Sequence, residues 1–253
     1  MSRHLLVVGA QRCGTTYLAS VLDAHPQVTM ARPPRPEPKA FLSDDVLALG
    51  ADGYRSTWFA HATTELVLGE KSTSYIEVPQ AAARALEALG PDTHVVAMLR
   101  DPVARAVSNW RFSTENGLER RPLAQALRDN LAAAAPWGGH TTSVSPFAYL
   151  ERGRYAEHLE AWWTAFPATT HVLLLQDVLD HPEPVDRLLA GLGVDPDLAP
   201  ARREAPLNES HQPVDDLPDD LLEQLHDYFA DCNRSLSRRL GRRLPWWPDP
   251  YQE

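Results

Sequence analysis

The first 22 residues of the chain constrain its fold most strongly. The apolar run from Leu5 to Val8 predicts a buried strand that breaks at Gly9, and Thr15 and Thr16 open a segment with apolar residues at helical spacing. A strand, a glycine turn and a helix N-terminus form a cradle for phosphate, because the first helical N–H groups lack partners and the helix dipole is positive there. The start of the chain therefore predicts an α/β domain that binds a phosphate-bearing ligand.

This cradle departs from the loop of nucleoside-triphosphate enzymes at one position. Gly9 and Gly14 have the spacing of G-x-x-x-x-G-K-[ST], but Thr15 stands where that pattern has lysine, and the cation is Arg12 inside the loop. A kinase needs the lysine on the outer phosphates and a hydroxyl group on magnesium. The loop therefore favours a phosphate-bearing donor handled without a metal, and a nucleotide kinase of related fold is the alternative.

Apolar runs alternate with helical patterns along the rest of the chain. Residues 66–76 carry a strand into a turn, and further buried strands are predicted at 94–99 and 171–175. Helices are predicted at 54–62, 79–89, 102–113, 123–135, 154–166, 185–193 and 220–241. This order predicts a P-loop-like, doubly wound, mainly parallel sheet flanked by helices. We expect one domain over residues 1–253, with a lid or substrate-side insertion around 114–147.

Composition limits the partners of the chain. Its net charge of −10 argues against nucleic acid or an anionic membrane as the main target. Cys13 and Cys232 lie far apart, which indicates no disulfide framework and fits a reducing compartment. No apolar run approaches the roughly 20 residues of a membrane span, so we expect a soluble, cytoplasmic protein. The oligomeric state stays open.

The two lysines of the chain stand out because arginine supplies almost all of its positive charge. Of 24 basic residues only Lys39 and Lys71 are lysines. A compact ammonium group differs from a planar guanidinium as a hydrogen-bond donor. We therefore expect both lysines to act at the functional site, with their chance survival as the alternative.

Four motifs together resemble a known family. GAQRCGTT, EPKAF, GEKSTSYI and LRDPVARAVSNW are similar to segments of sulfotransferases that use 3′-phosphoadenosine 5′-phosphosulfate. Within that family the chain resembles the glycan-modifying branch typified by heparan sulfate sulfotransferases, as a soluble bacterial-type member. The resemblance spans nearly the whole chain. It departs from the family pattern at Arg12, where the family loop usually has lysine, and at Thr73, which replaces the proline of E-K-[ST]-P-[AS]-Y.

The resemblance implies how the donor is bound. It assigns the 5′-phosphosulfate to the loop and the 3′-phosphate to an arginine that ends a strand and a serine in the next helix. The implied donor-binding residues are Gln11, Arg12, Cys13, Gly14, Thr15, Thr16, Arg100 and Ser108. Arg203 is a further candidate from a loosely matched late loop, and so is Asn208. Glu70, Lys71 and Tyr75 are implied in the acceptor cleft, and no metal is implied.

Sulfuryl transfer by in-line displacement needs a base for the acceptor proton and cations for the leaving phosphate. We expect Glu37 to be the base, with Lys39 facing the same way in an extended chain, and Arg12 and Lys71 to stabilise developing charge. Glu70 is the competing base. The other candidates for the base are His25 and His61, and Asp177 is expected to be an ordinary strand-end residue.

The acceptor is expected to be a hydroxyl or amine of a small metabolite, such as a secondary metabolite, or of a carbohydrate. The acidic chain with two lysines disfavours a long polyanionic glycan. A non-catalytic nucleotide-binding protein of the same fold is the remaining alternative.

Overall fold

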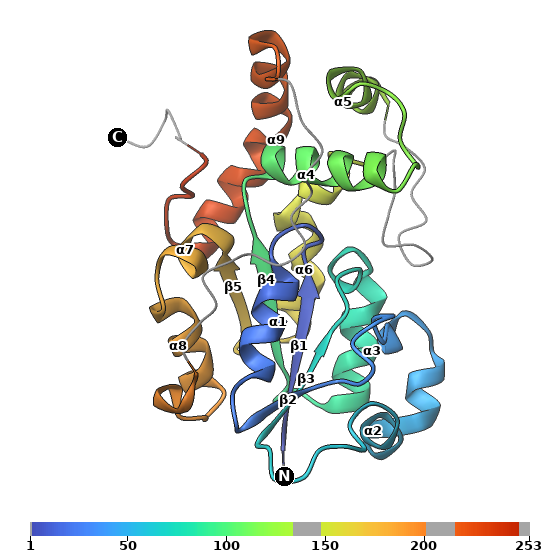
Figure 1. Ribbon diagram of the computed structural model, residues 1–253, viewed down its shortest axis with the longest axis vertical. Coiled ribbons are helices and arrows are strands. Elements are labelled where there is room, and N and C mark those ends of the chain that lie inside the picture. The colour runs from blue at the N-terminus through green and yellow to red at the C-terminus, as the bar shows by residue number, and fades with distance from the viewer. Residues whose placement is uncertain (1, 134–147, 201–215, 248–253) are drawn as a thin grey trace. The chain divides into compact units, whose positions relative to one another are not determined.

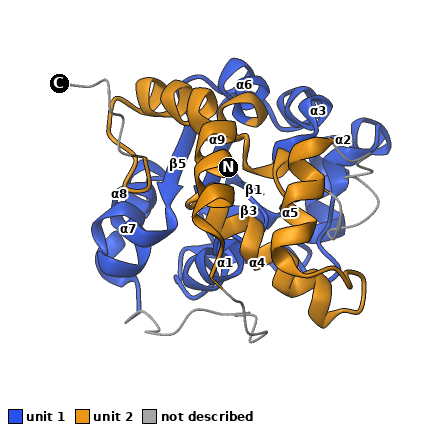
Figure 2. Ribbon diagram, turned by 90° about the horizontal axis from the view of Figure 1, so that it is seen from above, with its two compact units in different colours: residues 1–99, 159–208 blue, residues 100–158, 209–253 orange. Residues whose placement is uncertain are grey.

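The computed structural model describes residues 2–133, 148–200 and 216–247 and divides the chain into two compact units (Figure 2). Unit 1 comprises residues 1–99 and 159–208, and unit 2 comprises residues 100–158 and 209–253. The predicted insertion around 114–147 falls within unit 2. Its first part is helical, and residues 134–147 lie outside the described part of the chain.

Unit 1 is built on a five-stranded sheet in which every neighbouring pair is parallel, with the order β2-β3-β1-β4-β5. The strands are β1 (Arg3–Gly9), β2 (Val28–Met30), β3 (Val67–Lys71), β4 (His94–Leu99) and β5 (Thr170–Leu174). Figure 1 shows them side by side with helix α1 in front. Residues 5–8 of the central strand are fully buried, as a parallel strand covered on both faces requires. The predicted fold class is confirmed.

The helices of unit 1 agree with most of the sequence-based expectations. They are α1 (Thr15–Asp23), α2 (Asp45–Trp58), α3 (Pro79–Leu89), α7 (Leu175–Asp180) and α8 (Glu183–Gly191), with 3-10 turns at Ala40–Leu42, Tyr75–Glu77 and Pro196–Leu198. The prediction of 79–89 is confirmed to the residue, with proline at its first position and Gly90 after its end. The prediction of 54–62 is wrong, because α2 begins nine residues earlier and ends at Trp58.

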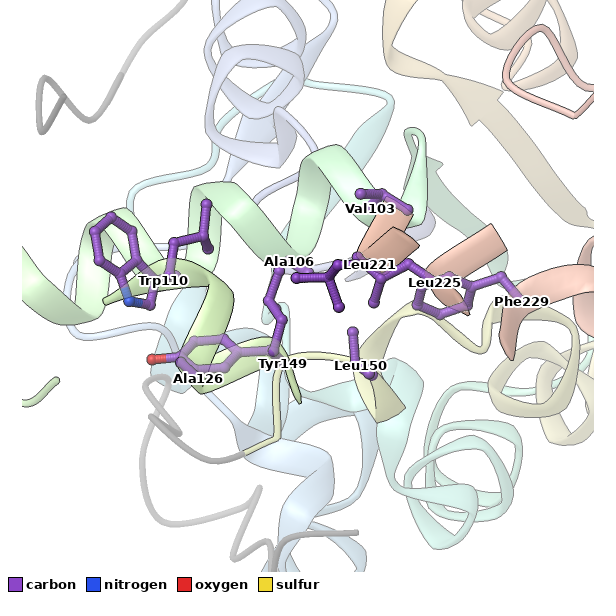
Figure 3. Close-up of a cluster of buried hydrophobic side chains, with 11 residues drawn as sticks. Val103, Ala106, Trp110, Ala126, Tyr149, Leu150, Leu221, Leu225 and Phe229 are labelled. Atoms are coloured by element: carbon purple, nitrogen blue, oxygen red, sulfur yellow. The ribbon is translucent and has the colours of Figure 1, made fainter. Parts of the chain in front are cut away.

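Unit 2 is helical and has its own hydrophobic core. Its helices are α4 (Pro102–Glu115), α5 (Leu123–Ala132) and α9 (Asp219–Leu240), with a 3-10 turn at Glu151–Gly153, and α6 (Tyr155–Ala165) begins in unit 2 and ends in unit 1. Figure 3 shows apolar side chains of α4, α5 and α9 packed together with Tyr149 and Leu150. Asp101 caps α4 by accepting a hydrogen bond from the Val103 N–H at 2.9 Å.

The strand order indicates where a ligand would bind unit 1. The connection after β1 leads to β2 on one side of the sheet, whereas the connection after β4 leads to β5 on the other. In open α/β sheets, ligands bind beyond the carboxyl ends of the strands where the connections diverge in this way. The glycine loop after β1 lies at this point, so topology and loop chemistry indicate the same edge.

We expect a half-buried histidine on β1, His4, to make stability depend on pH. Burial, with a smaller contribution from Arg55, lowers the pKa of His4 from 6.5 to about 4. His4 packs edge-on against Tyr54 and Phe59, with ring centroids 5.7 and 6.5 Å away. The pKa of His4 is lower in the folded state than in the unfolded state, so protonation of His4 favours unfolding. The free energy of unfolding is therefore not reduced by His4 above pH 6.5 and falls as the pH falls towards 4.

His4→Phe should therefore reduce the loss of unfolding free energy between pH 7 and pH 4 by up to about 3 kcal/mol. Urea unfolding at several pH values measures this effect, and His61→Phe, which replaces an exposed histidine, is the control. If His4→Phe and wild type lose stability in parallel, the acid sensitivity has another origin.

Candidate functional site

The loop between β1 and α1 has the backbone geometry of an anion cradle. Arg12 and Gly14 both have left-handed backbones, with φ of 67° and 80°, and Gly14 precedes the first helical residue, Thr15. No acidic residue lies in the first turn of α1, and its N-cap residue, Gly14, has no side chain that could cap the helix. The first N–H groups of a helix have no partner within it and its dipole end is positive, so this end of α1 suits the anion that the predicted donor loop requires.

Two glycines of this loop are required by close contacts. A Cβ atom on Gly9 would lie 2.5 Å from Cγ2 of Ile76 and 3.2 Å from the backbone oxygen of Thr73. A Cβ atom on Gly14 would lie 2.5 Å from Cδ1 of Leu175, in addition to the strain of its positive φ. The start of the loop therefore packs directly against residues 73–76, which follow β3 and include the predicted acceptor residue Tyr75.

Glu37, Lys71 and Thr73 form a polar cluster beside this loop. The Lys71 ammonium donates a hydrogen bond and forms an ion pair with Oε1 of Glu37. The Thr73 N–H donates to Oε2 at 3.0 Å, and the Thr73 hydroxyl lies 3.1 Å from the same oxygen. The side chains of Glu37 and Lys71 are 15% and 14% exposed, so both still reach the surface. This cluster offers a proton acceptor and a cation at the edge where a ligand is expected.

Lys39 lies near this cluster but does not pair with Glu37. Its backbone is left-handed, with φ 53° and ψ 28°, so the expectation of an extended chain through Lys39 is wrong. Its N–H donates to the Ser72 hydroxyl at 2.9 Å. Lys71, which is 34 positions after Glu37, lies beside the Glu37 carboxylate, where the sequence suggested Lys39.

Glu70, the competing base, is fully buried. Its carboxylate accepts hydrogen bonds from the hydroxyl groups of Tyr54 and Tyr75, both at 2.5 Å, and of Ser72 at 2.7 Å. Burial raises the pKa of Glu70, and the three hydroxyl donors oppose that rise. Burial, followed by the charge of Glu70, raises the pKa of each tyrosine. This geometry argues against the predicted contacts of Glu70 and Tyr75 with an acceptor, because neither side chain reaches solvent.

The partners of Glu70 also hold the segment that carries Glu37. Ser72 accepts the N–H of Lys39, and the Tyr75 hydroxyl accepts the N–H of Phe41 at 3.1 Å. Each of these hydroxyl groups thus joins Glu70 to the backbone of residues 39–41. The contribution of Tyr54 to this network was not predicted, and the pattern around residue 54 carries no signal for it.

The remaining candidate residues lie outside the cluster around Glu37 or outside the described residues. His25 is buried, and its ring nitrogens bond the Asp195 carbonyl and the Gln27 N–H at 2.9 and 3.1 Å, so backbone groups occupy both. His61 contacts the Thr29 hydroxyl at 3.0 Å. These contacts favour structural roles for both histidines. Asp177 lies in α7, and Arg203 and Asn208 lie outside the described residues.

Arg100 and Ser108, the residues predicted for the 3′-phosphate, belong to unit 2. Arg100 directly follows β4, and Ser108 lies two turns into α4; both are partly exposed. Their secondary-structure setting is the predicted one, an arginine after a strand and a serine in the next helix. Their contact with a donor remains a prediction.

The described residues contain neither a cluster of metal ligands nor a membrane-spanning helix. Over residues 2–133, 148–200 and 216–247, no three or more His, Cys, Asp and Glu side chains gather as ligands for a metal ion. In the same ranges no helix has the length and apolar character of a membrane span.

Comparisons with known proteins identify the family of the chain. A family model described as a sulfotransferase domain matches residues 2–176. The human heparan sulfate glucosamine 3-O-sulfotransferase 6 is 27% identical over 264 residues, covering 95% of this chain and 72% of that protein. The mouse heparan sulfate glucosamine 3-O-sulfotransferase 3B1 is 30% identical over 162 residues, covering 64% of this chain and 38% of that protein.

A solved structure extends the comparison to the fold. The crystal structure of a sulfotransferase from Alicyclobacillus acidocaldarius matches 96% of this chain and 98% of its own, with a TM-score of 0.75 and 24% sequence identity. At that identity, the similarity is one of fold.

Proposed function

This chain belongs to the sulfotransferase domain family and is a sulfotransferase, and on that premise we propose that it moves a sulfuryl group from 3′-phosphoadenosine 5′-phosphosulfate to a hydroxyl or amine of a small acceptor. The observation that carries the proposal is the Glu37–Lys71–Thr73 cluster, which packs beside the anion cradle through Thr73 and Gly9. It combines a base and a cation with a phosphate-binding loop, as the reaction requires.

In the proposed reaction the acceptor oxygen or nitrogen attacks the sulfur atom, and the bond between sulfur and the bridging phosphate oxygen breaks. Glu37 takes the acceptor proton. The leaving phosphate gains negative charge, which Arg12, the N–H groups of the loop and the hydroxyl groups of Thr15 and Thr16 would stabilise. The Lys71 ammonium is close enough to the base to serve the transferring group as well.

The net charge of the chain bears on the class of acceptor that it can bind. The relatives are named for heparan sulfate, a polyanion, whereas this chain carries a net charge of −10. A long polyanion approaching such a protein meets net repulsion, which local cations would have to overcome. We therefore propose a small metabolite or a short carbohydrate as the acceptor.

One experiment tests the donor and the class together. Thermal unfolding is measured with 3′-phosphoadenosine 5′-phosphate, with ATP and magnesium, and with buffer. Stabilisation by the bisphosphate alone supports the proposal, whereas stabilisation by ATP and magnesium alone supports a kinase. Sulfuryl transfer to a panel of phenols, amines and sugars then separates an enzyme from a non-catalytic binding protein.

The predicted 3′-phosphate site yields a mutational test. Arg100→Ala should weaken binding of 3′-phosphoadenosine 5′-phosphate by ~2–3 kcal/mol, the usual loss of a charge-assisted contact. Isothermal titration calorimetry measures the affinity. The control is Arg128→Ala, because Arg128 is an arginine of unit 2 that pairs with Asp220 at 2.9 Å. Equal affinities in the two variants would place the 3′-phosphate elsewhere.

A further inference from the structure

Thr73 occupies the position where the related motif has proline, and it donates to Glu37 in two ways. Its N–H lies 3.0 Å from Oε2, and its hydroxyl oxygen lies 3.1 Å from Oε2 and 3.3 Å from Oε1. Proline has neither a backbone N–H nor a hydroxyl group, so it could form none of these hydrogen bonds. We propose that Thr73 is a positioning residue that fixes the carboxylate of Glu37 for proton transfer; this rests on the proposed function.

The surroundings of Thr73 suit this role. Thr73 is buried, at 7% exposure, and its backbone oxygen would lie 3.2 Å from a Cβ atom on Gly9. Thr73 thus contacts the first residue of the donor loop on one side and holds the base on the other. A base is effective only when its distance and direction to the reacting proton are fixed, so this link between base and loop has direct catalytic value.

Thr73 also makes the base independent of Lys71. Lys71 binds Oε1, whereas the Thr73 N–H and the shorter contact of its hydroxyl are to Oε2, so Thr73 holds the oxygen that Lys71 does not. The ammonium group can rotate and has three N–H donors, and a transferring sulfuryl group would compete for them. A carboxylate held by Lys71 alone would lose its anchor when the ammonium turned away. With Thr73 in place, Glu37 keeps its position while Lys71 turns to the sulfuryl group.

The test compares Thr73→Val with Thr73→Ser. Valine keeps the shape and the N–H but removes the hydroxyl, and we expect kcat to fall roughly tenfold, the value of one charge-assisted hydrogen bond, with little change in the acceptor KM or in bisphosphate affinity. Serine restores the hydroxyl and should restore kcat. Ser74→Ala is the matched control, since the Ser74 hydroxyl is buried and makes no hydrogen bond within the described residues.

A double-mutant cycle with Glu37→Gln decides whether Thr73 acts through the base. If it does, Thr73→Val lowers kcat in the wild-type background and has no further effect beside Glu37→Gln. An unchanged kcat in Thr73→Val, or an equal loss in both backgrounds, would overturn the inference and leave the proposed function intact. Normal turnover of Glu37→Gln itself would instead refute the assignment of the base.

Discussion

Glu37→Gln is expected to lower turnover by roughly 10²–10⁴-fold, the usual contribution of a positioned general base. Glutamine has nearly the shape of glutamate, and its single side-chain oxygen can still accept a hydrogen bond from either Lys71 or Thr73. It cannot take up the acceptor proton under assay conditions. Donor binding should be unchanged, because the proposed donor contacts lie in the loop from Gly9 to Thr16 and at Arg100.

Turnover at saturating donor and acceptor measures this effect, and calorimetry with 3′-phosphoadenosine 5′-phosphate measures donor affinity. Glu65→Gln is the control, because Glu65 is a loop carboxylate outside the site that accepts the Thr63 N–H at 2.6 Å. The assignment of the base would be refuted by near-normal turnover of Glu37→Gln. Loss of turnover together with loss of bisphosphate binding would instead indicate a distorted loop.

Glu70→Ala is expected to have the largest effect on stability, a loss of about 3–5 kcal/mol in the free energy of unfolding. The substitution deprives the hydroxyl groups of Tyr54, Ser72 and Tyr75 of a shared acceptor in a fully buried place. A buried polar group without a partner costs about 1–3 kcal/mol, and the cavity left by the side chain adds to this. Glu70→Gln, which retains the volume and one acceptor oxygen, should lose less.

Urea unfolding of Glu70→Ala and Glu70→Gln measures these losses. Glu87→Ala on the exposed side of α3 should stay within about 0.5 kcal/mol of wild type. Turnover of Glu70→Gln, assayed well below its melting temperature, separates the two carboxylates further. If it retains much of the wild-type rate while Glu37→Gln does not, Glu70 acts as the anchor of the segment that carries the base. The opposite result would make Glu70 the base.

Local patterns of apolar residues in the sequence were sufficient to predict the fold class. A continuous apolar run can be satisfied only by burial on both faces, and helical spacing requires one apolar face. Because both signals lie within a few neighbouring residues, the strand over residues 5–8, the helix over 79–89 and the glycine loop could all be predicted. β2 has three residues and α7 has six, so neither shows a recognisable period. α2 was placed wrongly at 54–62 because two glycines precede Tyr54 within it, Gly53 and Gly50, the latter with non-helical backbone.

The sequence also supplied the candidate residues of the site, because the motifs around Gly9, Glu37 and Lys71 carry recognisable chemistry. It could not say which of them meet. Glu37 pairs with Lys71 and Thr73 rather than with Lys39, and Glu70 bonds Tyr54 across 16 positions and Tyr75 across five. Hydrogen bonds act over about 3 Å, so these pairings depend on which segments the sheet brings side by side. Only the tertiary structure decides that, because strand order and loop paths depend on packing throughout the unit and not on any local run of residues.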